Sequence, residues 1–239
     1  MDTRRLLAPF LAAPERSAVL LDVDGVLAPI APTPELASVP EETRAELRRL
    51  AAGYLLVACL SGRAGEDARR LVGVPAVTVV GNHGLELEPR ARELESAMAR
   101  FRDEIGLPVE DKGLSLTYHY RVTQDEGAAV AGLERVAEQA RTAGLVPRWG
   151  RMVLEIRPPV DADKGTAVRA LLARSGAARA LYAGDDTTDL DAFAGLVAAG
   201  LEYTLRIAVS SSEAPAALLD AAELIVTGPA ELADILRLL

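Results

Sequence analysis

This chain has one cysteine and no long apolar segment. The single cysteine, Cys59, excludes an internal disulfide framework and any metal site built only from cysteines. It lies within the apolar run YLLVACL, so we expect a small buried side chain and a cytoplasmic protein. No stretch reaches the roughly 18 uninterrupted apolar residues that a membrane helix requires, so we expect neither a transmembrane helix nor a membrane partner.

Basic residues are outnumbered, and lysine and histidine are rare. The net charge is −9, and no Lys/Arg run is dense enough for a basic face, so nucleic acid is not an expected partner. Only Lys112 and Lys164 are lysines among 26 Lys and Arg residues, and only His83 and His119 are histidines. Because arginine supplies the ordinary surface charge, the two lysines are candidates for lysine-specific chemistry.

The first 16 residues weakly resemble a secretion signal. Arg4 and Arg5 precede the apolar run LLAPFLAA, as the charged and apolar parts of a signal peptide would. This run is short and broken by proline, and a core-like strand follows it closely. We therefore expect a cytoplasmic chain rather than a secreted one.

Short apolar runs alternate with amphipathic segments through most of the 239 residues. The expected strands are 17–22, 54–60, 76–81, 179–183, 205–209 and 223–227. The expected helices are 40–52, 63–72, 163–175, 188–199, 213–221 and 229–238. Continuous apolar strands separated by helices indicate a parallel sheet covered on both faces, which predicts a doubly wound, Rossmann-like α/β fold.

The middle of the chain departs from this alternation. From about 87 to 158 the expected elements are helices over 91–105 and 125–143 and strands over 113–121, 145–149 and 152–157. In GLSLTYHYR, apolar residues alternate with polar ones, as in an antiparallel sheet with one exposed face. We therefore predict a core of residues 1–87 and 159–239 that is interrupted by an α+β insertion of residues 88–158.

Acidic residues follow two of the expected strands at the point where each strand ends. Asp22 and Asp24 follow the first strand, and Asp185, Asp186 and Asp189 follow a later one. The carboxyl ends of parallel strands form one edge of the sheet, where ligands of open α/β folds bind. Carboxylates that converge there repel each other unless a hard cation such as Mg²⁺ lies between them. A solvated Asp-x-Asp-Gly turn and a helix cap are the alternatives, and a cap needs only one acid.

Ser61 and Lys164 stand at two further helix starts. Ser61 follows a strand in the motif SGR, where its hydroxyl and the helix N-terminus suit phosphate oxygens. Lys164 opens a helix in DADKGTAV, where its charge opposes the helix dipole, so pairing with carboxylates and phosphate is expected. The alternatives are simple helix capping for Ser61 and ordinary exposure for Lys164.

These residues together resemble the four motifs of the haloacid dehalogenase-like phosphatases. In chain order the match consists of Asp22-Val-Asp24-Gly, Ser61, Lys164 and Gly184-Asp185-Asp186. The resemblance implies that Asp22 is a nucleophile that forms an aspartyl-phosphate. It implies that Asp24 protonates the leaving oxygen and then activates water, while Ser61 and Lys164 hold the phosphoryl oxygens.

The same resemblance implies a Mg²⁺ cofactor. Asp185 would complete the metal site with Asp22 and the main-chain carbonyl of Asp24. Asp186 or Asp189 would ligate the metal or orient waters bound to it.

Four stretches narrow the resemblance to the trehalose-6-phosphate phosphatases. They are GNHGLEL (81–87), SLTYHYR (115–121), LEIRPPVDADKG (154–165) and GDDTTDLDAF (184–193). The resemblance implies that residues 88–158 form a cap domain and that trehalose 6-phosphate is cleaved to trehalose and phosphate. The implied substrate-binding residues are Gly25, Gly62, Arg63, Asn82, His83, Lys112, His119, Arg121, Glu155 and Arg157.

Two positions depart from the family pattern, and other readings stay open. Val26 replaces the threonine usual after D-x-D-G, and Leu190 replaces a common acid near the metal. Sucrose phosphate, glycosyl-phosphoglycerate and trehalose-like pseudo-disaccharide phosphates are alternative substrates. A phosphosugar mutase, a receiver domain and a non-catalytic sugar-phosphate-binding module are alternative functions. The expected partner is a small sugar phosphate, bound by a monomer.

Overall fold

The computed structural model describes residues 2–120, 123, 125–150, 152–212 and 214–239. The chain forms two compact units, one made of Met1–Leu87 and Ala162–Leu239 and the other of Glu88–Asp161. The second boundary lies after Asp161, slightly later than the expected position between 158 and 159. Residues 158–161 line a hollow together with Val146 and Arg148 of the second unit.

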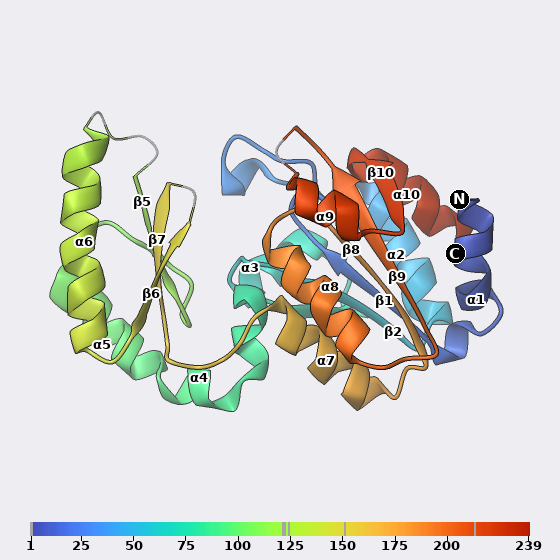
Figure 1. The fold of residues 1–239 in the computed structure, drawn as a ribbon, viewed down its shortest axis with the longest axis horizontal. Coiled ribbons are helices and arrows are strands. Elements are labelled where there is room, and N and C mark those ends of the chain that lie inside the picture. The colour runs from blue at the N-terminus through green and yellow to red at the C-terminus, as the bar shows by residue number, and fades with distance from the viewer. Residues whose placement is uncertain (1, 121–122, 124, 151, 213) are drawn as a thin grey trace. The chain divides into compact units, whose positions relative to one another are not determined.

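A six-stranded parallel sheet forms the centre of the first unit (Figure 1). Its strands are β1 (Ser17–Asp22), β2 (Leu56–Leu60), β3 (Thr78–Val80), β8 (Arg179–Gly184), β9 (Tyr203–Ser210) and β10 (Leu224–Thr227). They lie in the order β10-β9-β8-β1-β2-β3, and every neighbouring pair is parallel. All six residues of β1 are buried, which explains the apolar run AVLL at residues 18–21. The predicted doubly wound α/β class is confirmed.

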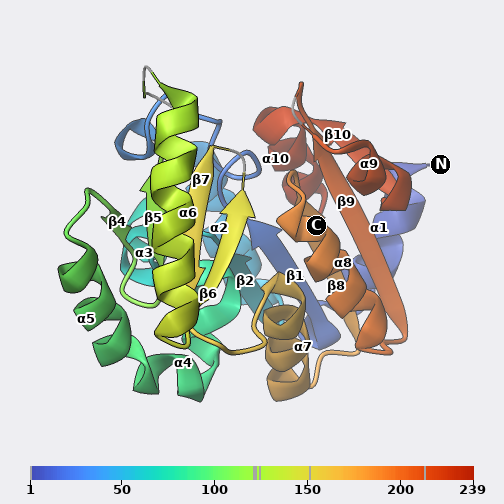
Figure 2. The ribbon, with the colours of Figure 1, turned by 60° about the vertical axis from the view of Figure 1, so that its left-hand side comes forward.

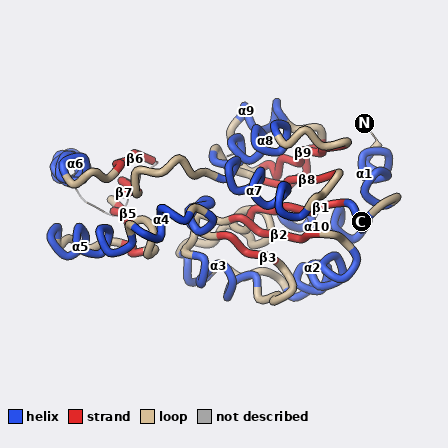
Figure 3. Tube along the Cα trace, turned by 90° about the horizontal axis from the view of Figure 1, so that it is seen from below, coloured by secondary structure: helices blue, strands red, loops and turns tan. Residues whose placement is uncertain are grey.

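Helices cover both faces of this sheet (Figure 3). They are α1 (Thr3–Leu11), α2 (Glu41–Gly53), α3 (Gly65–Val72), α7 (Lys164–Ser175), α8 (Thr188–Ala198), α9 (Ala216–Ala221) and α10 (Gly228–Leu238). Apolar side chains of α1, α2 and α10 join one core cluster, and those of α7, α8 and α9 join the other. The carboxyl ends of β8, β1 and β2 are therefore neighbours at one edge of a sheet that is packed on both sides.

The segment that weakly resembles a secretion signal belongs to the folded core. Leu6, Leu7 and Phe10 of α1 are buried in the apolar cluster that also contains α2 and α10. The Arg179 guanidinium donates a 2.6 Å hydrogen bond to the Pro9 carbonyl oxygen near the end of α1. The apolar residues of this segment are thus used for packing against the sheet.

A four-stranded antiparallel sheet and its helices make up the second unit. The elements are α4 (Pro89–Glu93), α5 (Glu95–Ile105), β4 (Glu110–Asp111), β5 (Leu116–His119), α6 (Glu126–Thr142), β6 (Val146–Gly150) and β7 (Val153–Arg157). The strand order is β4-β5-β7-β6, and α6 contacts β6 and β7 (Figure 2). Leu116 and Leu154 join the apolar cluster with the helices. Neighbouring side chains of a strand alternate between the two faces of the sheet, so Thr117 and its register partner Glu155 lie on the face away from the helices. On β6, Arg148 is the register partner of Glu155.

The single helix expected over 91–105 is two helices in the structure. The chain breaks at Leu94, whose φ of −93° and ψ of 0° end α4 and precede α5. Among the described residues, no helix has the length and apolar content that crossing a membrane requires.

Candidate active site

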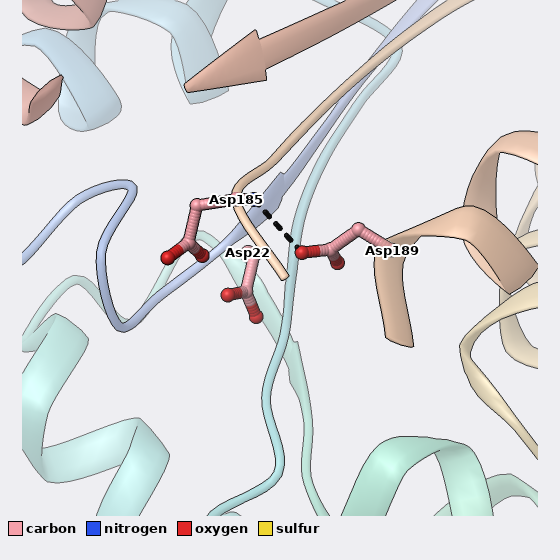
Figure 4. A group of neighbouring side chains, drawn as sticks. All are labelled: Asp22, Asp185 and Asp189. Atoms are coloured by element: carbon pink, nitrogen blue, oxygen red, sulfur yellow. Dashed lines mark hydrogen bonds between the residues drawn. The ribbon is translucent and has the colours of Figure 1, made fainter. Parts of the chain in front are cut away.

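Three carboxylates converge at the carboxyl ends of β1 and β8 (Figure 4). Asp22 is the last residue of β1, Asp185 directly follows β8, and Asp189 lies in the first turn of α8. One oxygen from each of the three carboxylates lies within 4.8 Å of the others. Asp186 points elsewhere, because it is exposed and its Oδ1 accepts a 2.5 Å hydrogen bond from the Thr187 N–H.

Lys164 joins this cluster from the start of α7. Its Nζ donates to Asp22 Oδ1 at 2.8 Å and to Asp189 Oδ1 at 2.7 Å, and the residue is only 2% exposed. Burial alone would lower the pKa of Lys164, but the charges of Asp189 and Asp22 outweigh burial and raise it. The lysine is therefore a fixed cation. The capping box of Asp163 and Thr166 holds the helix start against the unfavourable dipole.

Asp189 is fully buried, and donors surround both of its oxygens. Oδ1 accepts from the Tyr182 hydroxyl at 2.7 Å as well as from Lys164. Oδ2 accepts from the backbone N–H groups of Asp185 at 2.9 Å and Asp186 at 3.0 Å. These contacts fix the backbone that presents the Asp185 carboxylate. Sequence reasoning missed Tyr182, although its position two residues before GDD on a strand places it near the same edge.

The cluster is electrostatically unfavourable for carboxylates by themselves. Burial raises the pKa of Asp22 well above its ordinary value, with Asp189 and Asp185 adding to the rise and Lys164 opposing it. Burial, together with the charge of Asp189, raises the pKa of Asp185 to about 7. Both shifts mean that burial and neighbouring carboxylates together disfavour the ionised forms more than Lys164 favours them.

The donor set fits a hard divalent cation. Asp185 Oδ1 is buried and has no hydrogen-bond partner among the described residues, so one oxygen is available to a ligand. Gly25 has a φ of +79°, and a Cβ there would lie 2.1 Å from Asp185 Oδ2. The Asp-x-Asp-Gly turn thus leaves space for the second carboxylate. Buried carboxylate oxygens beside a backbone turn are suitable ligands for Mg²⁺.

Asp24 lies outside the three-carboxylate cluster and pairs with Arg63. The Arg63 Nε donates to Asp24 Oδ2 at 2.8 Å and its Nη2 donates to Oδ1 at 2.7 Å, which is a bidentate pair. Arg63 Nη1 also donates to the Pro34 carbonyl oxygen at 3.0 Å. The guanidinium therefore fixes the direction of the Asp24 carboxylate from the loop after β2.

Ser61 begins that loop directly after β2, and its side chain is buried. Ser61 Oγ accepts a 3.1 Å hydrogen bond from the Arg63 N–H, which leaves its hydroxyl proton for another acceptor. Gly62 lies against the His83 ring, since a Cβ at position 62 would be 2.5 Å from ring atoms. Asn82 and His83 both have a positive φ, of 52° and 51°, which is strained for residues with side chains. The structure thus brings the expected residues 61–63, 82 and 83 together.

The remaining expected residues belong to the second unit. His119 Nε2 lies 2.7 Å from Glu110 Oε2, and Lys112 Nζ lies 3.9 Å from Glu110 Oε1. Sequence reasoning missed Glu110, which the E-x-K spacing before Lys112 could have indicated. Arg157 is buried at the end of β7. Arg121 lies outside the described residues.

Glu155 and Thr117 carry buried oxygens that the sequence analysis did not connect. Among the described residues, neither Glu155 Oε1 nor Thr117 Oγ1 has a hydrogen-bond partner. The two residues are register partners on β7 and β5, on the face away from the helices. Two buried polar atoms side by side on this face are suited to a ligand that has hydroxyl groups.

Comparison with known proteins agrees with the fold and the motifs. The family model described as trehalose-phosphatase matches residues 20–103 and 92–219. A trehalose-phosphate phosphatase of Mycobacterium marinum is 35% identical over 226 residues, which cover 85% of this chain and 57% of that protein. One of Mycobacterium avium is 37% identical over 199 residues, covering 74% of this chain and 50% of that protein. The chain thus spans about half the length of these two relatives.

Two solved structures show the same architecture. A trehalose-6-phosphate phosphatase related protein gives a TM-score of 0.74 at 23% identity, covering 92% of this chain and 95% of that chain. A haloacid dehalogenase-like hydrolase from Bacteroides thetaiotaomicron gives a TM-score of 0.63 at 15% identity, covering 92% of this chain and 98% of that chain. Both similarities support the fold class found here.

Proposed function

The chain belongs to the trehalose-phosphatase family, and from that premise we propose that it is a Mg²⁺-dependent phosphatase acting on trehalose 6-phosphate. The observation that carries the proposal is the buried cluster at the sheet edge. There, Lys164 joins Asp22 to Asp189, and Asp185 keeps a buried oxygen that has no partner among the described residues. This arrangement suits the transfer of a phosphoryl group to a carboxylate.

The proposed reaction has two displacement steps. In the first, an Asp22 oxygen attacks phosphorus, the bond from phosphorus to the sugar oxygen breaks, and Asp24 gives that oxygen a proton. In the second, Asp24 takes a proton from water, the water oxygen attacks phosphorus, and the bond to Asp22 breaks to release phosphate. A carboxylate is a weak nucleophile, so the reaction depends on neutralising the charge of the phosphate it attacks.

Positioning of the phosphate falls to residues that the sheet edge already holds. Lys164 presents a fixed cation beside Asp22, and the Ser61 hydroxyl is free to donate to a phosphoryl oxygen. Asp22, Asp185 and the main-chain carbonyl of Asp24 would hold Mg²⁺. When bound, the ion would supply Lewis-acid stabilisation of negative charge on the phosphoryl oxygens.

Asp24 and Asp189 take different roles in this proposal. The bidentate pair with Arg63 orients the Asp24 carboxyl group, which gives a proton to the leaving oxygen in the first step and takes one from water in the second. Asp189 acts as a positioning residue, because its two oxygens already accept four hydrogen bonds. Asp186, which is exposed, would at most orient waters at the rim of the site.

The second unit is proposed to act as the cap that selects the sugar. Its face away from the helices carries Glu155 and Thr117, whose buried oxygens have no partner in the described part of the chain and would bond sugar hydroxyls. Lys112 and His119 belong to the same unit and are proposed to contribute further polar contacts. We also propose that the chain works as a monomer in the cytoplasm. The free, buried Cys59 fits a reducing compartment.

Free phosphate released from trehalose 6-phosphate tests this function. We expect release by the wild type with Mg²⁺, none with EDTA, and a loss of at least about a thousandfold in kcat for Asp22→Asn. Asp220→Asn, an exposed acid on α9, is the matched control and should behave like the wild type. Phosphate release from sucrose 6-phosphate or glucosyl-3-phosphoglycerate alone would show that trehalose 6-phosphate is not the substrate. No release from any phosphate ester would contradict the proposed phosphatase reaction.

A further inference from the structure

The segment after β3 holds the turn that carries Ser61. The Ser61 N–H donates to the Val80 carbonyl oxygen at 2.9 Å, and the His83 N–H donates to the Ser61 carbonyl oxygen at 2.9 Å. The Asn82 N–H donates to the Arg63 carbonyl oxygen at 2.7 Å. Residues 61–63 and 80–83 are therefore joined by backbone hydrogen bonds from both sides, so the position of one segment fixes the other.

Glu86 reaches both segments from the 3₁₀ helix Asn82–Leu87. Its Oε2 accepts a 3.0 Å hydrogen bond from the Gly81 N–H, directly after β3. Its Oε1 faces the first residue of α3, since a Cβ at Gly65 would lie 1.8 Å from that atom. One carboxylate thus touches the end of β3 and the start of the helix that follows the Ser61 turn.

The environment suits a negative charge. Helix α3 begins after Ala64, which makes no side-chain capping hydrogen bond, and the helix dipole favours an anion beside Gly65. Arg69, about one helical turn further along α3, lies 3.2 Å from Glu86 Oε2. The Glu86 side chain is only 17% exposed, whereas the Arg69 side chain is 52% exposed. The charge of Glu86 is therefore directed toward the backbone of the turn rather than toward solvent.

We propose that Glu86 is a positioning residue for the phosphate-binding turn. It fixes Ser61 and Arg63 by linking Gly81 to the start of α3, and it does not touch the substrate. Arg63 in turn orients Asp24, so Glu86 governs both phosphate binding and the direction of the proton donor. The inference rests on the proposed phosphatase function. It also predicts a change in the hydrogen exchange of the turn, which is measured independently of activity.

Two substitutions at Glu86 and two controls test the proposal. Glu86→Leu removes both the acceptor and the charge, whereas Glu86→Gln keeps an oxygen for the Gly81 N–H. Arg69→Gln removes the half-exposed ion pair and the Arg69 hydrogen bond to the Val79 carbonyl oxygen, while Glu86 keeps its bond to the Gly81 N–H. Leu50→Ala, in the core cluster on α2, lowers stability without touching the turn. The readouts are KM and kcat for trehalose 6-phosphate, competitive inhibition by inorganic phosphate, and hydrogen exchange of the amides of residues 61–67.

For Glu86→Leu we expect about a tenfold rise in both KM and the inhibition constant of inorganic phosphate, with faster exchange in the turn. Glu86→Gln should keep KM and the phosphate inhibition constant close to their wild-type values. Leu50→Ala should change neither constant, while its thermal midpoint falls. Unchanged phosphate inhibition and unchanged exchange in Glu86→Leu would overturn the proposal. Failure of the wild type to hydrolyse any phosphate ester would refute the proposed function, whereas the exchange result would still decide the role of Glu86.

Discussion

Asp185 is a carboxyl group whose ionised form is disfavoured both by burial and by a neighbouring negative charge. Its pKa is raised from 3.8 to about 7 by burial and by Asp189. Between these two values the unfolded chain has released the proton while the folded protein still holds it, so stability falls as the pH rises. The loss is complete once the pH exceeds the folded pKa.

We expect Asp185→Asn to remove this loss in metal-free protein. With EDTA, its thermal midpoint should exceed that of the wild type by about 2–6 °C above pH 7, and the difference should shrink as the pH falls toward 4. Asp186→Asn, an exposed neighbour, is the control and should show no such gain. Mg²⁺ should stabilise the wild type but not Asp185→Asn. An Asp185→Asn variant that is no more stable than the wild type at pH 8 would contradict this account.

The sequence showed which acids gather at the sheet edge but not which of them turn inward. Asp185 and Asp189 are four residues apart and converge with Asp22, whereas Asp186, between them, bonds to the adjacent backbone and is exposed. Side-chain direction at a loop-to-helix junction depends on the backbone path, which residue type does not determine. The pairing of Asp24 with Arg63, 39 positions apart, likewise depends on the fold.

At the scale of elements, the loop after β2 depends on close backbone contact. Gly62 has no side chain, and the His83 ring fills the space where a Cβ would lie, with ring atoms 2.5 Å away. His83 is held in place by its own backbone bond to Ser61. The contact therefore requires glycine for steric reasons, and any side chain there would displace the ring or the turn.

Gly62→Ala should lower the free energy of unfolding by about 1–3 kcal/mol, because the added methyl group overfills this contact. It should also reduce phosphatase activity, since the turn carries Ser61. Gly132→Ala is the control: it lies within α6, where the nearest atom to a Cβ is 3.8 Å away, and should gain roughly 0.5–1 kcal/mol. Denaturant unfolding measures both values. If Gly62→Ala and Gly132→Ala had equal free energies of unfolding, the His83 ring would move aside without loss of stability, contrary to this prediction.

Elements with a clear period were predictable, and those without one were not. The buried strand β1 was expected at 17–22 and lies at Ser17–Asp22, because an apolar run of that length has few alternatives. Helix α1 was missed because its apolar residues also suit a secretion signal. The break at Leu94 was missed because neither glycine nor proline marks it, and β4 was missed because it has only two residues.

At the scale of the whole molecule, the two units are proposed to divide the reaction between chemistry and selection. The acids and Lys164 belong to the first unit. Thr117 and Glu155, whose buried oxygens have no hydrogen-bond partner among the described residues, belong to the second. A substrate without a sugar would depend only on the acids and Lys164 of the first unit. Comparing a sugar phosphate with a simple aryl phosphate therefore separates the two contributions.

Thr117→Val replaces a buried hydroxyl with a methyl group of similar size. We expect KM for trehalose 6-phosphate to rise about threefold to tenfold, because a neutral hydrogen bond contributes on the order of 1 kcal/mol. The kcat/KM for p-nitrophenyl phosphate should stay unchanged, and the thermal midpoint should not fall, since no hydrogen bond among the described residues is lost. Thr142→Val, at the exposed end of α6, is the control. Equal losses of kcat/KM on both substrates would mean that Thr117 supports the stability of the protein. A loss confined to trehalose 6-phosphate would mean that Thr117 takes part in selecting the sugar.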